Sequence, residues 1–271
     1  MAESAIYVYG VARELPGEAL AQVDGVGGAP VQVIGHGGLT AVVSPVSLDD
    51  FGEDALRRNL EDLGWLESTA RAHHAVVDAA AASAAIAPLG LATVYRNEDR
   101  LRAALRDQSE EFTRALDRIT GRTEWGVKAY ADLKRAASSA PATGQDAPAA
   151  RPGTSYLQRR RVEQHSEEQA RREVLAVASD IDNELRDIAA TGRLHRPQDP
   201  QLSGERGWMI LNAAYLVDDE RAEDFRAAVE RLAGLRPEIR LQLTGPWAPY
   251  SFATESENED GGEDGEEVWI G

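Results

Sequence analysis

Short runs of apolar residues, several of them alternating with polar ones, predict the β-strands of the first ~120 residues. The predicted strands are residues 6–10, 31–34, 39–44 and 89–95. The sequence Gly-His-Gly-Gly at residues 35–38 separates the second strand from the third, and it is typical of a hairpin turn. Pro45 follows the third strand and is expected to end it, because proline cannot donate a backbone hydrogen bond.

Apolar residues with helical spacing predict the helices of the same part of the chain. These helices are residues 18–23, 50–63, 65–85 and 98–120. Asp49 or Asp50 is expected to cap the second helix and Asn97 the fourth, and Gly121 follows the fourth as a natural stop. The inward-facing positions of the third helix are Leu66, His73, Val77 and Ala80. Those of the fourth are Leu101, Leu105, Phe112, Leu116 and Ile119.

This order of elements predicts the fold of a first domain. Strand, helix, strand, strand, helix and strand follow one another, with one extra helix at the end. That is the split β-α-β, or ferredoxin-like, pattern with an antiparallel sheet and helices on one face. We therefore expect a ferredoxin-like N-terminal domain over residues 1–121.

A second α+β domain is expected over residues 122–253. Its strands are residues 125–130, 208–217 and 238–244, and its helices are residues 155–190 and 219–232. A weak strand in the region 193–197 would complete the same split β-α-β order, although the two halves share no sequence repeat. The strands 125–130 and 208–217 are expected to pair in one sheet, and Trp247 and Tyr250 to anchor the last segment onto this domain. Residues 136–153 are rich in Ala, Ser, Pro and Gly and predict a mobile loop.

The long helix over residues 155–190 changes character along its length. Its second half has an apolar stripe with helical spacing. The stripe consists of Val174, Ala178, Ile181, Leu185 and Ile188. Its first half is almost wholly polar and contains five arginines among glutamates. These are Arg159, Arg160, Arg161, Arg171 and Arg172. Two interpretations stay open: the arginines pair with glutamates along a solvated helix, or they form a contact surface for a partner protein.

Charge and composition exclude several classes of protein. The chain has 271 residues, 29 Lys and Arg against 46 Asp and Glu, and a formal net charge of −17, which argues against binding to nucleic-acid phosphates. It has no cysteine, so disulfides, thiolate metal sites and cysteine nucleophiles are excluded. No run is long and apolar enough for a membrane helix, and the N-terminus does not resemble a signal peptide. We expect a cytoplasmic protein.

The last residues, 254–271, are predicted to be an acidic disordered tail. Eight acidic residues and no basic one lie between Glu255 and Glu267. Val268, Trp269 and Ile270 then form an apolar tip. The tail is either simply solvated or carries in this tip a short docking motif for a groove or a sheet edge.

Few residues suggest catalytic or ligand-binding chemistry. His73 and His74 are adjacent in a helix, so they point about 100° apart and cannot chelate one metal ion together. The expected arrangement is a packed His73 and a solvated pair of His74 and Asp78. The Gly-rich sequence at 35–38 leads into a strand rather than a helix, which disfavours phosphate binding. We expect no catalytic residue, no metal site and no cofactor.

Six motifs in order carry a resemblance to a known family. They are Ile6–Gly10, Ala87–Tyr95, Trp125–Tyr130, Tyr156–Arg161, Leu211–Val217 and Leu243–Phe252. Together they resemble the GvpL/GvpF family of gas vesicle accessory proteins over roughly residues 5–253. One departure lies in the last motif, where Ala248 replaces a proline of the family's Pro-Trp-Pro-Pro-Tyr pattern.

The resemblance implies a non-enzymatic role. Members of this family help to build the gas vesicle, a hollow protein shell, and are thought to bind the hydrophobic major shell protein and other accessory proteins. It also implies a ferredoxin-like N-terminal domain followed by an α+β domain. We therefore expect an assembly protein located at the gas vesicle in the cytoplasm. The alternative hypotheses are a tandem ferredoxin-like module that binds a small regulatory ligand, and an enzyme using His73, His74 and Asp78.

Overall fold

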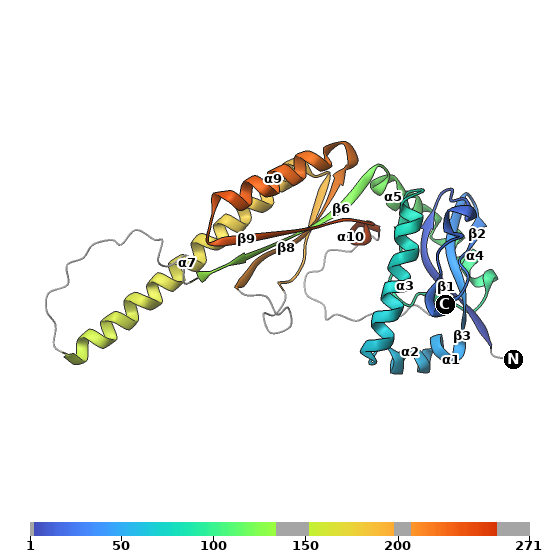
Figure 1. The fold of residues 1–271 in the computed structure, drawn as a ribbon, viewed down its shortest axis with the longest axis horizontal. Coiled ribbons are helices and arrows are strands. Elements are labelled where there is room, and N and C mark those ends of the chain that lie inside the picture. The colour runs from blue at the N-terminus through green and yellow to red at the C-terminus, as the bar shows by residue number, and fades with distance from the viewer. Residues whose placement is uncertain (1–2, 134–151, 198–206, 254–271) are drawn as a thin grey trace. The chain divides into compact units, whose positions relative to one another are not determined.

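A computed structural model describes residues 3–133, 152–197 and 207–253, with the backbone alone for residues 152–167. The predicted mobile loop over 136–153 falls almost wholly outside the described residues, as does the predicted acidic tail over 254–271. The chain forms two compact units, one built from residues up to Thr123 together with those from Trp247 onward, the other from Glu124–Pro246. Each unit contains one antiparallel sheet and several helices (Figure 1).

The sheet of the first unit has the strand order β2-β3-β1-β4, and β5 also pairs with β1. Its strands are β1 (Ser4–Ala12), β2 (Gln32–His36), β3 (Leu39–Ser47), β4 (Ile86–Pro88) and β5 (Val94–Tyr95). The predicted hairpin is confirmed, since β2 and β3 are joined by Gly37 and Gly38 alone, both with positive φ. Such a two-residue turn needs this backbone conformation, which glycine adopts without strain.

Two strand boundaries differ from the prediction. Pro45 does not end β3, which continues to Ser47 and pairs Pro45 with Ile6 of β1. The partner on the other side, β2, already ends its pairing at Val43, so Pro45 has no hydrogen bond to donate there. Of the predicted strand 89–95, only Val94–Tyr95 forms a strand. Just before it, Ala92 has a φ of 64°, and its amide donates to the hydroxyl of Tyr7 at 3.1 Å.

The helices before β4 are shorter than predicted. The single expected helix over 50–63 is two, α1 (Leu48–Phe51) and α2 (Glu53–Asn59), and the cap of the first is Ser47 rather than Asp49 or Asp50. The next helix, α3 (Leu63–Ala81), is capped by Asp62, whose carboxylate accepts from two backbone amides. The expected helix over 18–23 is only a 3-10 turn, η1 (Gly17–Leu20), which is followed by a second, η2 (Val26–Gly28).

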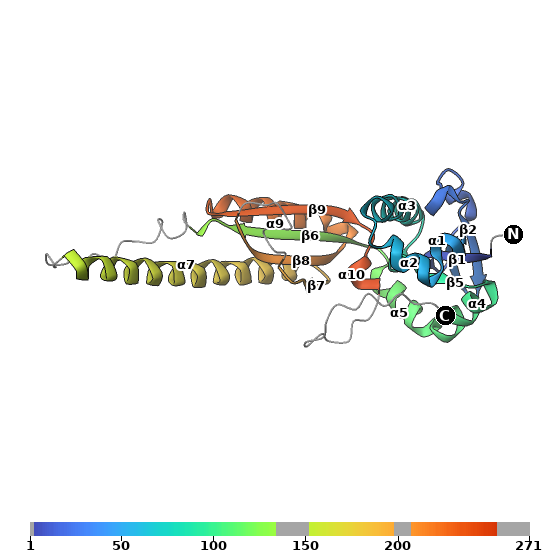
Figure 2. The ribbon, with the colours of Figure 1, turned by 90° about the horizontal axis from the view of Figure 1, so that it is seen from below.

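Helices cover both faces of the first sheet, rather than one face as predicted (Figure 2). Residues of α3 pack with Tyr7 and Tyr9 of β1 in one core cluster. The helices α4 (Glu98–Asp107) and α5 (Ser109–Ile119) lie on the opposite side of the sheet from α3 (Figure 2). The reason is that β1 is buried almost throughout, so both of its faces need a cover. The predicted cap Asn97 and the predicted stop Gly121 are confirmed, although the helix breaks between Asp107 and Ser109.

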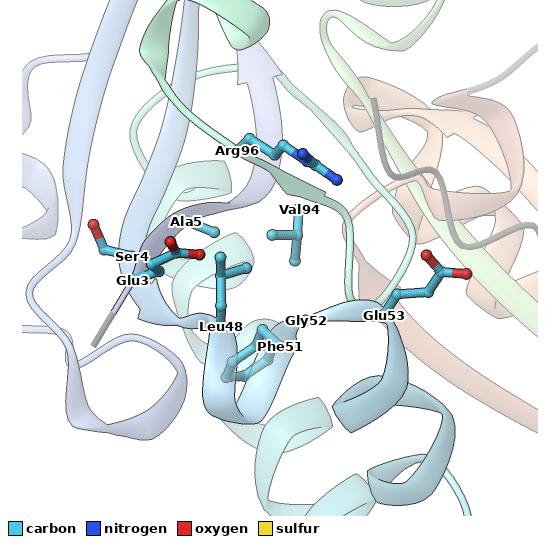
Figure 3. Close-up of a pocket in the computed structure, with 9 residues that line it drawn as sticks. All are labelled: Glu3, Ser4, Ala5, Leu48, Phe51, Gly52, Glu53, Val94 and Arg96. Carbon is cyan, nitrogen blue, oxygen red and sulfur yellow. The ribbon is translucent and has the colours of Figure 1, made fainter. Parts of the chain in front are cut away.

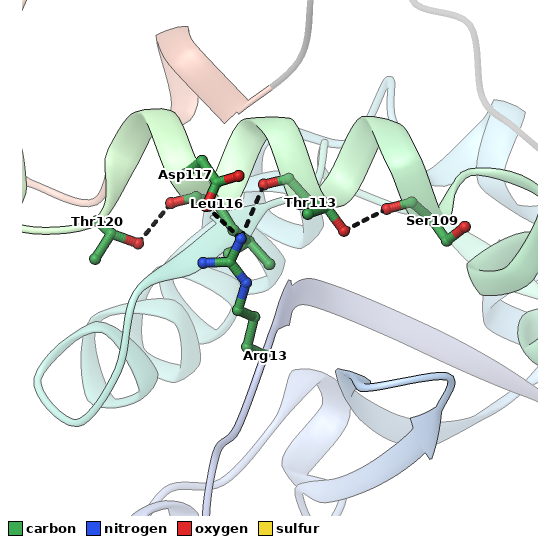
Figure 4. A network of polar contacts seen from close by, with 6 residues as sticks. All are labelled: Arg13, Ser109, Thr113, Leu116, Asp117 and Thr120. Atoms are coloured by element: carbon green, nitrogen blue, oxygen red, sulfur yellow. Dashed lines mark hydrogen bonds and ion pairs between the residues drawn. The ribbon is translucent and has the colours of Figure 1, made fainter.

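Arg13 fixes the end of β1 against α5. Its guanidinium donates to the carbonyl oxygen of Thr113 at 3.3 Å and forms an ion pair with Asp117 (Figure 4). The hydroxyl of Thr113 in turn donates to the carbonyl of Ser109 within the helix. Because both charged side chains are largely exposed, the pair orients these elements more than it stabilises them.

The second unit repeats the strand order of the first. Its strands are β6 (Arg122–Ala131), β7 (Thr191–Leu194), β8 (Trp208–Asp218) and β9 (Ile239–Trp247), and their order in the sheet is β7-β8-β6-β9. The predicted pairing of the strands at 125–130 and 208–217 is confirmed, since β6 and β8 are neighbours. The weak strand is β7, slightly earlier than the predicted region 193–197.

Two helices pack against this sheet, α7 (Pro152–Ile188) and α9 (Ala222–Leu235). The predicted apolar stripe of α7 is confirmed: Val174, Ala178, Ile181 and Leu185 are buried in the core of the unit and Ile188 is packed at its border. Helix α7 begins at Pro152, so the last two residues of the predicted loop belong to it. The helix predicted over residues 219–232 is α9, which begins at Ala222 and continues past the predicted end to Leu235.

The end of the chain differs from the expected domain division. Residues from Trp247 onward belong to the first unit, where Ala248 is part of the core and Tyr250 packs at its border. The short helix α10 (Tyr250–Ala253) lies beside α5. The prediction that Trp247 and Tyr250 anchor this segment onto the second domain is wrong, because the rings that face Tyr250 are His73 and His74 of α3.

Candidate functional site

The candidate partner contact predicted from sequence lies on α7, and we call its five arginines the basic segment. The side chains of Arg159, Arg160 and Arg161 lie outside the described residues. The side chains of Arg171 and Arg172 are described, and both are exposed. They lie on the turns of α7 where its buried positions begin. They lie between two buried residues, Ala170 at 1% exposure and Val174 at the start of the apolar stripe, so the described arginines lie where α7 meets its own unit.

The two described arginines differ in what they contact. The guanidinium carbon of Arg171 lies 5.7 Å from the centre of the Trp208 ring, within the range of a cation–π interaction. The Nε of Arg172 donates to the carbonyl oxygen of Glu168 in the preceding turn at 3.4 Å. No described carboxylate forms an ion pair with Arg172, so its guanidinium keeps donors for an external acceptor.

A buried histidine–tyrosine cluster occupies the core of the first unit, and it consists of Tyr7, Tyr9, His73 and Tyr250. The hydroxyl of Tyr7 lies 2.9 Å from Nδ1 of His73. The same hydroxyl accepts from the amide of Ala92 at 3.1 Å, so Tyr7 connects the His73 ring to the segment before β5. The expected packing of His73 is confirmed, since it is 2% exposed, whereas His74 and Asp78 are exposed.

Electrostatics keep this cluster uncharged near neutral pH. Burial and the neighbouring His74 lower the pKa of His73 from 6.5 to about 4. Burial raises the pKa of Tyr7 and of Tyr9 above the usual value of 10. Burial, together with the negative charge of Asp78, also raises the pKa of Tyr250. A neutral, largely buried cluster of this kind serves packing and the attachment of the C-terminal segment.

A pocket of about 440 Å³ lies at the start of β1 (Figure 3). Ala5, Leu48, Phe51 and Val94 supply its apolar surface, and Arg96 lies at its rim. The sequence did not predict it, because its lining comes from three separate segments that only the fold brings together. Among the described residues, no group of His, Asp and Glu could hold a metal ion. Within the same described ranges, no helix is both long and apolar enough to cross a membrane.

Comparison with known proteins relates nearly the whole chain to gas vesicle proteins. The family model described as "Gas vesicle synthesis protein GvpL/GvpF" matches residues 5–254. Gas vesicle protein L of Streptomyces sp. (strain CB03234) is 42% identical over 251 residues, which cover 91% of this chain and 92% of that protein. Gas vesicle protein F of the same strain is 28% identical, covering 91% of this chain and 98% of that protein.

Solved structures show the same fold. The crystal structure of the gas vesicle protein GvpF from Anabaena sp. PCC7120 matches with a TM-score of 0.70 at 22% identity, covering 94% of this chain and 98% of that one. GvpF from Microcystis aeruginosa matches with a TM-score of 0.65 at 19% identity, covering 93% and 99%.

Proposed function

The chain belongs to the GvpL/GvpF family of gas vesicle synthesis proteins, and on this premise we propose that it binds the hydrophobic shell protein during vesicle assembly. A role in the gas vesicle is what its relatives share. The proposal goes further in naming the major shell protein as the partner, together with other accessory proteins of the same assembly. It also assigns the chain a non-enzymatic role in the cytoplasm. The match of the family model over residues 5–254 is the observation that carries it.

Physical chemistry supports such a carrier. A shell subunit that excludes water exposes apolar surface before it is assembled, and exposed apolar surface promotes aggregation. A partner with a net charge of −17 keeps a complex with this subunit dispersed by electrostatic repulsion. The charge also favours a partner surface with the opposite sign or with apolar character over one that is strongly acidic.

We place the contact on the basic segment of α7. This helix has 37 residues, and its N-terminal half extends past the strands of its own unit (Figure 1). The buried positions begin only at Ala170 in the part whose side chains are described. Arginine suits such a surface because its planar fork binds carboxylates or carbonyl groups while its stem covers apolar area. The five arginines are Arg159, Arg160, Arg161, Arg171 and Arg172.

We also propose a ferredoxin-like classification for each unit. The strand orders β2-β3-β1-β4 and β7-β8-β6-β9 are equivalent, and both correspond to the split β-α-β arrangement. In the first unit the 3-10 turns η1 and η2 stand where that arrangement has its first helix. The helices α4 and α5 are then an addition that covers the second face.

The experiment is affinity capture of the tagged full chain from cells that also express the shell protein. We expect the shell protein to be retained by the wild-type chain. The variant Arg171→Glu/Arg172→Glu is expected to retain less, and the variant with Arg159, Arg160 and Arg161 replaced by glutamate less than half of the wild-type amount. The matched control is Arg226→Glu/Arg236→Glu, which changes the same charge on exposed positions outside α7.

Two results separate the parts of this proposal. Failure of the wild-type chain to retain the shell protein contradicts the partner. Normal retention by both α7 variants, with unchanged melting temperatures, contradicts only the assignment of the contact to the basic segment.

A further inference from the structure

The outer edge of β9 takes no part in the function proposed above. β9 ends the sheet order β7-β8-β6-β9, so β6 pairs with one of its edges, and no strand among the described residues pairs with the other (Figure 2). It spans nine residues, Ile239–Trp247, whereas β7 at the opposite end of the sheet spans four. Residues 241–245 are all half-buried, whereas most of β8 is buried, as expected for an edge strand beside a central one.

The other edges of the two sheets are short or blocked, and β9 is not. In the first unit, Arg102 of α4 donates to the carbonyl oxygen of Gly35 in β2 at 2.5 Å, and the three-residue β4 lies beside α5 and α10. A bare edge is a template for another strand, so proteins commonly protect it with charges, proline or a covering helix. The one charged residue of β9, Arg240, lies over the ring of Tyr130 in its own sheet, 4.4 Å from the ring centre. Pro246 is only at the end of the strand.

The hydrogen bonds of β9 to β6 fix which backbone groups point outward. The amide of Asp132 donates to the carbonyl oxygen of Glu238 at 3.0 Å, so this residue and every second one after it point their backbone groups toward β6. The hydroxyl of Thr244 donates to the carbonyl oxygen of Gly126 at 3.4 Å, which agrees with the same register. The residues between them in β9 therefore point their backbone N–H and C=O groups away from the sheet.

Leu241 and Leu243 are the outward-pointing residues of the regular part of the strand. On one side of them, the amide of Ile239 is already bound within the preceding turn. On the other side, Gly245 has a φ of 117°, which a regular strand does not have. The stretch that can accept a further strand is therefore 240–244, and it is symmetric about its middle residue.

We propose that the β9 edge binds the β9 edge of a second copy of this chain, antiparallel and about a two-fold axis at Gln242. In this register Leu241 meets Leu243 of the second copy, and each such pair exchanges both of its backbone hydrogen bonds. Both leucines are packed at the border of the core and are half-buried, so their side chains cover one another across the axis. Arg240 lies opposite Thr244, so no like charges meet.

A second copy is the occupant that this edge favours. A two-fold interface needs a patch that is complementary to itself, and the stretch 240–244 has this property in its outward backbone groups, its leucines and its charge. β9 contains no acidic residue, although the chain has 46, so the repulsion between two chains of net charge −17 is not concentrated at this edge. Salt screens the repulsion that remains, and association is therefore expected to strengthen as salt is added.

The test is sedimentation velocity of the full chain at roughly 1–300 μM in about 0.3 M salt. We expect the average mass of the wild-type chain to rise with concentration toward twice that of one chain. Gln242→Lys and Gln242→Glu each place two like charges directly opposite at the axis, where side chains are closest, and each should weaken association at least about tenfold. A mixture of the two variants should associate as the wild type does, because opposite charges then face one another.

The matched control is Thr191→Lys, which adds the same charge at an exposed position of β7, the other edge strand of this sheet, and should leave association unchanged. Circular dichroism checks that each variant is folded. A wild-type chain that stays monomeric over the whole range overturns the proposal. Association of both Gln242 variants as strong as that of the wild type overturns it too, because the contact then lies elsewhere. So does a mixture of the two variants that associates no better than either one alone.

Discussion

Titration of His73 gives a sharp test of the histidine–tyrosine cluster. The pKa of this buried side chain is about 4, against 6.5 in an unfolded chain. Between these two values the unfolded state binds more protons than the folded state, so the stability of the first unit falls as the pH is lowered from 6.5 toward 4. From these two pKa values, the free energy of unfolding of the first unit is about 2.5 kcal/mol lower at pH 4.5 than at pH 7.

The variant His73→Gln removes this contribution, and His74→Gln is the matched control, since His74 is the adjacent but exposed histidine. The assay is amide hydrogen exchange in β1, which lies against His73 and reports the opening free energy of the first unit. Carboxylates titrate alike in all three proteins, so their effect cancels in the difference between wild type and variant. We expect His73→Gln to lose about 2.5 kcal/mol less than the wild type between pH 7 and pH 4.5. His74→Gln is expected to fall between the two, because the charge of His74 contributes to the low pKa of His73. An equal loss in wild type and His73→Gln would refute a neutral, buried His73.

The remaining predictions concern packing in both units. Leu185→Ala in α7 should lower the free energy of unfolding by about 2–5 kcal/mol because the side chain is fully buried, whereas Leu175→Ala, at 44% exposure on the same helix, should change it by less than ~1 kcal/mol; urea unfolding measures both. Tyr215→Phe removes a hydrogen bond of 2.7 Å from the hydroxyl to Asp182 and should cost about 1.5–3 kcal/mol by the same method; no measurable change would mean that water replaces the hydroxyl. Trp247→Ala should cost less than ~2 kcal/mol, and not the ~3–5 kcal/mol of a buried tryptophan, because the ring is 51% exposed; a loss in the higher range would show that Trp247 is buried in solution.

Local sequence patterns were sufficient for most elements of this fold. The stripe from Val174 to Leu185 predicted α7 and its buried face, because helical spacing of apolar residues is a direct consequence of burying one side of a helix. The Gly37-Gly38 turn and the Asn97 cap were predictable for the same reason, since each depends on a single residue type in a single backbone conformation.

The errors lie where distant residues decide the local structure. Residues 89–95 are apolar enough for one strand, but the hydroxyl of Tyr7 holds the amide of Ala92 in a turn, and nothing near Ala92 in the sequence indicates that contact. Tyr250 was expected on the second domain, and its actual neighbours His73 and His74 lie more than 170 residues away. The pocket was missed because its lining comes from three separate segments of the chain that only the fold brings together. The basic segment, in contrast, was predictable as a charged helix, but a sequence cannot distinguish a partner surface from a solvated one.

Binding of the shell protein is the central claim, and sedimentation measures it most directly. Purified shell protein is diluted from denaturant into buffer with increasing amounts of the full chain, and the fraction left in the supernatant after centrifugation is recorded. The proposed function predicts that the supernatant fraction rises with the chain and saturates at a fixed ratio, and that it rises less with the variant in which Arg159, Arg160 and Arg161 are replaced by glutamate. A supernatant fraction that stays at the level of the shell protein alone, at every concentration of the folded chain, would contradict the claim.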